Sequence, residues 1–194
     1  MQKFVIVSFL ACGALFAQPQ LPSEPQPTPI TVEERVEWFR HATVGVPTMV
    51  AGVIPAGFGT LFNRPKEYGT HWDGFGKRYG IRLTGSSTSN AMEASLGAVW
   101  GEDPRYYRLG RGQGFKRRLK NALVQAFVDH DRHGNVMPAY ARYMAIPGSN
   151  FLSNTWRPGS EANVSGALLR TGLGFLDRAA SNLFNEFWVS VHHH

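Results

Sequence analysis

The chain has 194 residues, a formal net charge of +6 and one cysteine, and 43% of its residues are hydrophobic. This length suits a single folded domain. Cys12 lies in a leader that we expect to be removed, so the mature chain excludes disulfides, thiolate metal sites and a cysteine nucleophile. The basic balance favours anionic lipid or cell-wall polymer as partners, and we expect neither a nucleic-acid partner nor a cofactor.

Residues 1–17 have the three-part pattern of a secretory signal peptide. Lys3 supplies the early positive charge, an apolar run from Phe4 to Phe16 follows, and Ala17 is the small residue before a polar turn. The run is shorter than the roughly 20 residues that a permanent membrane anchor needs. The sequence therefore predicts an exported protein of the periplasm or outer envelope.

A proline- and glutamine-rich stretch, residues 18–30, follows the leader and predicts an extended tether. Thr31 and Glu34 then stand in capping-box register, and Val32, Val36 and Phe39 continue at helical spacing. A helix is therefore predicted to begin at residue 31, where the single helical domain, residues 31–188, starts.

The stretch 42–62 carries no charged residue, and its length and basic flanks permit a membrane span. Pro47 and Pro55, together with several glycines, weaken its helix propensity. The favoured interpretation is a buried or interfacial helix broken near Pro55. A true span and irregular structure remain open as alternatives.

Glycine and proline punctuate the rest of the chain. Gly69, Gly74, Gly76 and Gly80 argue against a continuous helix over 68–83, and a polar break is expected at 86–90. Apolar residues at helical spacing predict helices over 89–100, 115–128, 138–146 and 161–188, with a small-residue segment at 148–156, a turn at 129–134 and a tail at 189–194.

The sum is a mainly α fold of short, amphipathic, small-residue-rich helices. The alternative is a small β-barrel, which would use 79–83 and 187–191 as strands.

Basic and aromatic residues alternate in three places, and such side chains can stack or bind phosphate and carboxylate groups. The alternative is internal pairing of these arginines with Asp73, Glu102 and Asp103. The predicted contacts to an anionic ligand or lipid headgroup are Lys77, Arg78, Tyr79, Arg105, Tyr106, Tyr107, Arg108, Arg117 and Arg118.

The densest cluster with metal-ligand chemistry is DHDRH, residues 129–133. His130, Asp131 and His133 are weak candidates, because residues so close in sequence cannot all face one ion and Arg132 adds a competing charge. A polar turn is the favoured interpretation there. His71 beside Asp73 could orient an imidazole, but no nucleophile accompanies it in a recognisable pattern.

Three blocks, GFGKRYG (74–80), EDPRYYRLG (102–110) and NEFW (185–188), resemble a family of uncharacterised exported proteins frequent in acidobacteria. The resemblance implies an envelope protein and supplies no catalytic residues, because that family has no established activity. The leading hypothesis is therefore a non-enzymatic envelope protein associated with a membrane or wall, and 42–62 is the segment proposed to contact a membrane. The alternatives are a metal-binding protein or hydrolase centred on His and Asp, and a secreted membrane-active protein whose basic helix at 115–128 binds anionic surfaces.

Overall fold

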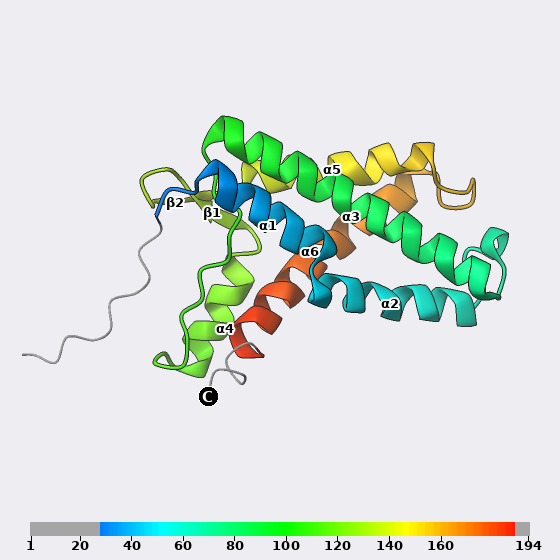
Figure 1. Ribbon diagram of the computed structural model, residues 1–194, viewed down its shortest axis with the longest axis horizontal. Helices are drawn as coiled ribbons and strands as arrows, with labels where there is room; N and C mark the ends of the chain where they lie inside the picture. The colour runs from blue at the N-terminus through cyan, green and yellow to red at the C-terminus, as the bar shows by residue number, and fades with distance from the viewer. Residues whose placement is uncertain (1–27, 189–194) are drawn as a thin grey trace, which may run out of the picture.

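The computed structural model describes residues 28–188, and these form a mainly helical fold, which confirms the predicted fold class (Figure 1). The predicted signal peptide, residues 18–27 of the tether and the tail lie outside the described residues. The elements are α1 (Val32–Val44), α2 (Val46–Leu61), η1 (Lys66–Tyr68), α3 (Trp72–Trp100), α4 (Phe115–Val124), β1 (Val128–His130), β2 (Val136–Pro138), α5 (Tyr140–Leu152), η2 (Ser153–Thr155) and α6 (Val164–Phe187).

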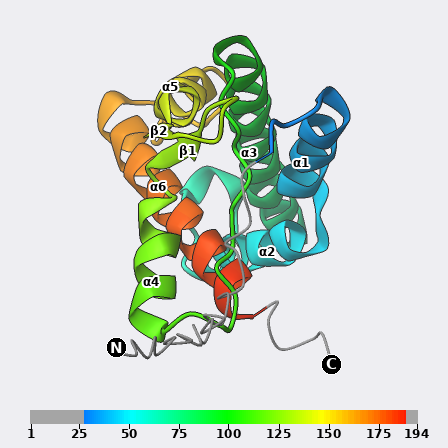
Figure 2. The same ribbon diagram turned by 90° about the vertical axis from the view of Figure 1, so that its left-hand side faces the viewer.

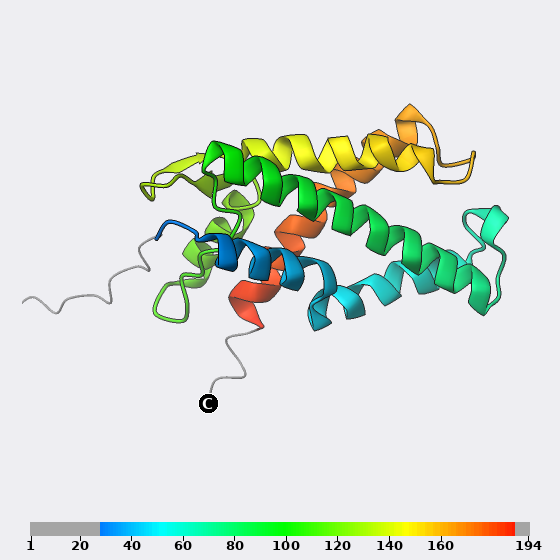
Figure 3. The same ribbon diagram turned by 45° about the horizontal axis from the view of Figure 1, so that its top comes forward.

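The helices are arranged around one central pair. The long helix α3 packs along α5, α1 and α2 pack against α3, and α6 packs against α5 (Figures 1 and 3). Helix α4 packs only against α6 among its larger contacts, and seen from the end of the molecule it lies on the far side from α1 and α2 (Figure 2). The pair α1 and α2 therefore lies on one side of the central pair α3 and α5, and the pair α4 and α6 lies on the other.

Strands β1 and β2 form a small antiparallel hairpin after α4. Val128 pairs with Pro138 and His130 with Val136, and a bridge joins His130 to Asp103. Helix α4 therefore ends at residue 124, earlier than the predicted 128, because the chain is drawn into this hairpin. The β-barrel alternative is wrong for residues 28–188, where this hairpin is the only sheet and 79–83 lie inside α3.

The uncharged stretch 42–62 breaks at Gly45 and not near Pro55. The capping box of Thr31 and Glu34 is confirmed at the start of α1. Gly45 then adopts an extended conformation with ψ 146°, and Pro47 stands in the first turn of α2, where a missing N–H costs nothing. Pro55 lies inside α2. The helix continues there because it packs on α3, where the Cβ position of Gly52 lies 3.0 Å from the Tyr79 ring.

Gly74, Gly76 and Gly80 and the polar residues of 86–90 do not interrupt α3, which is 29 residues long, whereas Gly69 lies before it with φ +75°. Glycine lowers helix propensity, but tertiary contacts outweigh it here. At Gly74 a Cβ atom would lie 2.4 Å from the carbonyl of Tyr68, so glycine permits a close approach. Thr84 and Thr88 donate their hydroxyls to carbonyls four residues earlier, which satisfies them within the helix.

Helix α5 also runs through a proline. Pro147 lies inside α5, so the two predicted segments, 138–146 and 148–156, form one helix from 140 to 152 and the turn η2. The predicted helix over 161–188 is confirmed as α6, which begins three residues later, at Val164, because Asn163 caps it through the amide of Gly166.

The interior holds small apolar side chains and charged ones. The buried hydrophobic residues are nearly all alanines, at positions 56, 122, 126, 139, 141, 145 and 167, joined by Ile146. The largest fully buried side chains are instead Arg142, Glu102 and Glu186. A protein interior normally carries its large apolar side chains, and charged residues are buried only when they are paired.

Candidate functional site

A buried charge network lies between α3, α5, α6 and the hairpin. Arg142 donates from Nε to Glu93 Oε1 at 3.0 Å and from Nη2 to Asp129 Oδ1 at 2.6 Å. Its Nη1 donates to the carbonyls of Gln125 and Ala126. Arg178 adds a contact from α6, at 2.9 Å from Glu93 Oε1. Each of the three guanidinium nitrogens of Arg142 therefore donates inside the protein, as a buried guanidinium requires.

Two carboxylates near the hairpin are only half satisfied. Glu102 accepts the amide of Ala141 at 2.8 Å in the first turn of α5, and its other oxygen has no hydrogen-bond partner among residues 28–188. Asp129 Oδ2 likewise has none within those residues. Burial raises the pKa of Glu102, and it raises the pKa of Asp129 to about 6 against the attraction of Arg142.

Arg105, Tyr107 and Asp103 form a second cluster, beside His130. Arg105 contacts Asp103 at 2.7 Å and Glu34 at 2.8 Å, and Tyr107 donates its hydroxyl to Asp103 at 2.6 Å. Burial raises the pKa of Tyr107 and lowers that of His130. Pairing with Asp103, the internal alternative, is therefore what the structure shows for Arg105. Its side chain is only 23% exposed.

Tyr106 and Arg118 converge on Glu186, which is fully buried near the end of α6. Tyr106 donates to Glu186 Oε2 at 2.6 Å, Arg118 Nε donates to Oε1 at 2.7 Å, and the Arg118 guanidinium lies 4.5 Å from the centre of the Phe187 ring. Burial raises the pKa of Tyr106. Both predicted ligand contacts are thus occupied in holding the 105–114 loop and α4 to α6.

Two of the predicted ligand residues in the block 74–80, Arg78 and Tyr79, also form hydrogen bonds inside the protein. Arg78 is buried and donates to the carbonyls of Arg64, Pro65 and Gly69, so it ties the loop after α2 to α3. Tyr79 donates to the carbonyl of Met49 at 3.2 Å. The hydrogen-bonding groups of Arg78 are therefore turned inward, and its contact with an external ligand stays a prediction.

The remaining predicted residues are at the surface. Lys77 is exposed and lies 3.8 Å from Asp73, and Arg117 is exposed and donates to Gln113. Arg108 is half-buried, and no described residue forms a hydrogen bond or ion pair with its side chain. Lys77 and Arg117 lie far apart in the fold, on α3 and α4, so the predicted residues do not form one ligand site.

The candidate metal residues build a turn. Asp131 accepts the side-chain amide of Asn135 at 3.1 Å and the backbone amides of Asn135 and His133 at 2.9 and 2.7 Å, and these hydrogen bonds lower its pKa. The ring of His130 instead lies edge-on to Tyr107, and His133 is exposed. No three of the His, Cys, Asp and Glu side chains in residues 28–188 are placed to hold one metal ion. The geometry therefore fits the polar-turn interpretation.

The outward side of α2 is apolar, where the surface of a soluble protein is normally charged. The exposed large side chains of α2 are each between 47% and 79% exposed, and α2 carries no charged residue. One helical stretch of the described chain, Val32–Leu61, is long and apolar enough by length and composition to cross a membrane, and 11% of its most apolar window is buried. These outward residues of α2 and its end are Val46, Val50, Val53, Ile54, Phe58, Leu61 and Phe62.

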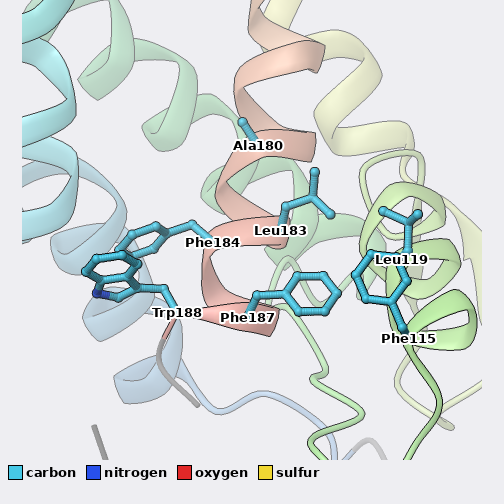
Figure 4. A pocket seen from close by; sticks show the side chains of 7 residues that line it. All are labelled: Phe115, Leu119, Ala180, Leu183, Phe184, Phe187 and Trp188. Atoms are coloured by element: carbon cyan, nitrogen blue, oxygen red, sulfur yellow. The ribbon is translucent and has the colours of Figure 1, made fainter. Parts of the chain in front are cut away.

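An apolar groove opens between α4 and the end of α6, with a volume of about 630 Å³. In Figure 4 the rings of Phe187 and Phe115 lie against each other, with ring centres 5.4 Å apart, while Phe184 and Trp188 stack at 5.5 Å on the opposite side of α6. The lining of this α4–α6 groove is Phe115, Leu119, Ala180, Leu183, Phe184, Phe187 and Trp188.

Helix α2, the end of α6 and the start of α4 lie on the same side of the molecule. In both Figure 1 and Figure 2 they form its lower side, away from α5. We call this side the apolar face, and define it by the outward residues of α2 together with Phe115, Phe184 and Trp188, which are 41–65% exposed. Exposed large apolar side chains on one side of a molecule are typical of surfaces that meet lipid or a partner.

Sequence reasoning missed the buried network, although a signal for it exists. Glu93, Arg142 and Arg178 each interrupt a run of small and apolar residues at a helical position that faces the core. A charge at such a position predicts a buried partner, but one sequence does not say which carboxylate meets which arginine.

The fold and the site together define a mainly α-helical protein that has charged residues inside and an apolar face outside. No protein-family model matches the chain, and neither a curated protein nor a solved structure does.

Proposed function

We propose that this chain is a non-enzymatic protein of the cell envelope that associates with a membrane through its apolar face. The observation that carries the proposal is the inverted distribution of side chains. Arginines and carboxylates pair in the interior, while the large apolar residues of α2 stand in contact with solvent. Proteins in lipid also place charged groups inward and apolar groups outward, because a charged group in contact with hydrocarbon is costly.

The geometry favours a helix that lies on the membrane over one that crosses it. Helix α2 has 16 residues and is about 24 Å long, which is less than the roughly 30 Å of a hydrocarbon core. Helix α1 cannot extend it, because the chain bends at Gly45 and α1 carries Glu33, Glu34, Glu37 and Arg40. Transfer of one large apolar side chain from water is worth roughly 1.5–3 kcal/mol, so the outward residues of α2 supply enough free energy for association.

Export belongs to the same proposal. The signal-peptide pattern of residues 1–17 and the resemblance to exported acidobacterial proteins support a location in the periplasm or outer envelope. The interior network supports a structural role for most predicted ligand residues. It leaves the apolar face and the basic side chains near it as the surfaces available to a partner.

The test is fractionation of cells that express the full chain, with salt and carbonate washes of the membranes. We expect the wild type to stay with the membranes in high salt. Ile54→Glu with Phe58→Glu changes two outward residues that are 61% and 56% exposed, and this variant should move to the soluble fraction while its circular dichroism is unchanged. Val32→Glu with Val36→Glu, on α1 outside the apolar face, is the matched control. A wild type found wholly in the soluble fraction would overturn the proposal.

A further inference from the structure

A basic rim borders the α4–α6 groove. The chain from 104 to 128 contains arginines and lysines and no aspartate or glutamate. Arg105 is paired with Asp103 and Arg118 with Glu186. Lys116 and Lys120 are exposed, and no described residue forms an ion pair with either of them. Their charge therefore faces solvent beside an uncharged groove.

The position of the two lysines follows from the helix period. Phe115 and Leu119 line the groove, and Lys116 and Lys120 each follow one of them in sequence, about 100° around α4. Both lysines therefore share one edge of the groove. The first turn of α4 has no acidic residue, so the positive end of the helix dipole adds to their field.

This rests on the proposed function and names the partner of the apolar face: we propose that the α4–α6 groove receives an acyl chain of an anionic lipid, whose headgroup contacts Lys116 and Lys120. The groove supplies an apolar, aromatic wall for the chain, and the rim supplies the opposite charge for the headgroup. Trp188, which stacks on Phe184 at the same end of α6, is an aromatic residue of the kind that prefers the headgroup boundary, because its indole N–H is polar. Charge complementarity selects lipid over a second copy of this chain, because two copies would bring these lysines together.

The experiment measures binding of the full chain to vesicles of phosphatidylcholine with and without phosphatidylglycerol. We expect binding to both, with clearly tighter binding to the anionic vesicles and loss of that preference at high salt. Lys116→Gln with Lys120→Gln should weaken binding to the anionic vesicles about tenfold and leave binding to the neutral ones unchanged. Lys66→Gln with Lys77→Gln removes the same charge from exposed positions outside the rim and is the matched control.

Quenching by lipids with brominated acyl chains tests the groove itself. The fluorescence of the wild type should be quenched, and Trp188→Phe should remove much of that quenching. Equal binding to neutral and anionic vesicles, or equal effects of the two lysine pairs, would overturn this inference and leave the membrane association standing. Binding to neither vesicle would overturn the proposed function. Self-association without lipid that Leu183→Glu abolishes would overturn the inference in favour of a second copy.

Discussion

The guanidinium of Arg142 lies 2.6 Å from the carboxylate of Asp129, and the two side chains are 1% and 2% exposed. Glu93, 4% exposed, holds the other edge of Arg142 at 3.0 Å. A buried ion pair adds little net stability compared with an apolar core, because both charges lose their hydration. Removal of one partner, in contrast, strongly destabilises the fold, because the remaining charges stay buried without a counter-charge.

Arg142→Met should therefore destabilise the fold by about 3–5 kcal/mol, because Glu93 and Asp129 lose their shared cation. Urea unfolding followed by circular dichroism measures this change. Arg40→Met is the control, since Arg40 forms a surface pair with Glu37 and is 64% exposed. Its midpoint should match that of the wild type. Equal shifts for the two variants would contradict the buried network.

Asp129 should make stability depend on pH. Its pKa is raised to about 6 from a usual value of 3.8, so protonation favours the folded state. The contribution is fully present below pH 3.8 and is lost as the pH rises through about 6. Wild-type protein should therefore lose stability relative to Asp129→Asn between about pH 4 and pH 6, the interval between the two pKa values.

The comparison with Asp129→Asn cancels the contributions of the other titrating groups to the pH dependence of stability. Glu102, whose pKa is also raised, and His130, whose pKa is lowered, are present in both proteins. Urea midpoints at several pH values give the difference. A difference between the two proteins that stays constant from about pH 4 to pH 6 would show that the pKa of Asp129 is not raised in the folded state.

Tyr106→Phe should loosen the loop that leads to α4. Its hydroxyl donates to Glu186 Oε2 at 2.6 Å, and the same carboxylate accepts the amides of Leu109 and Gly110, each at 3.2 Å. Loss of a hydrogen bond to a buried charge costs about 1.5–3 kcal/mol. Hydrogen exchange should therefore speed up at residues 109 and 110. Tyr140→Phe, at an exposed tyrosine, should leave both exchange and stability unchanged.

Helices with local sequence signals could be predicted from the sequence. The structural role of most charged residues could not. The capping box at Thr31 and the helix that ends near Trp188 follow from local patterns, which act within a few residues. The contact of Tyr106 with Glu186 joins residues 80 positions apart. The three blocks that resemble an exported family contain Arg78, Tyr106 and Glu186, all of which hold the fold together.

The failures at Pro55 and at the glycines of α3 have one cause. Local propensity opposes a helix at both places, and packing along α3 overrides it. The basic residues were ambiguous for a different reason. An arginine beside tyrosines has the same appearance in sequence whether its partner is a buried carboxylate or a lipid phosphate. Burial separates the two: Arg118 meets Glu186, whereas Lys116, two residues earlier, faces solvent.

Two glycine substitutions test whether α3 is one continuous helix that ends at Trp100. At Gly80 a Cβ atom would meet nothing within 4 Å, so Gly80→Ala should stabilise the protein by about 0.5–1 kcal/mol through the better helix propensity of alanine. Gly101 ends the helix with φ +79°, a left-handed conformation that costs other residues about 1–2 kcal/mol. Gly101→Ala should therefore lower stability. Thermal unfolding distinguishes the two variants by the sign of the change in Tm, and a lower Tm for Gly80→Ala would mean that the chain is not helical at residue 80.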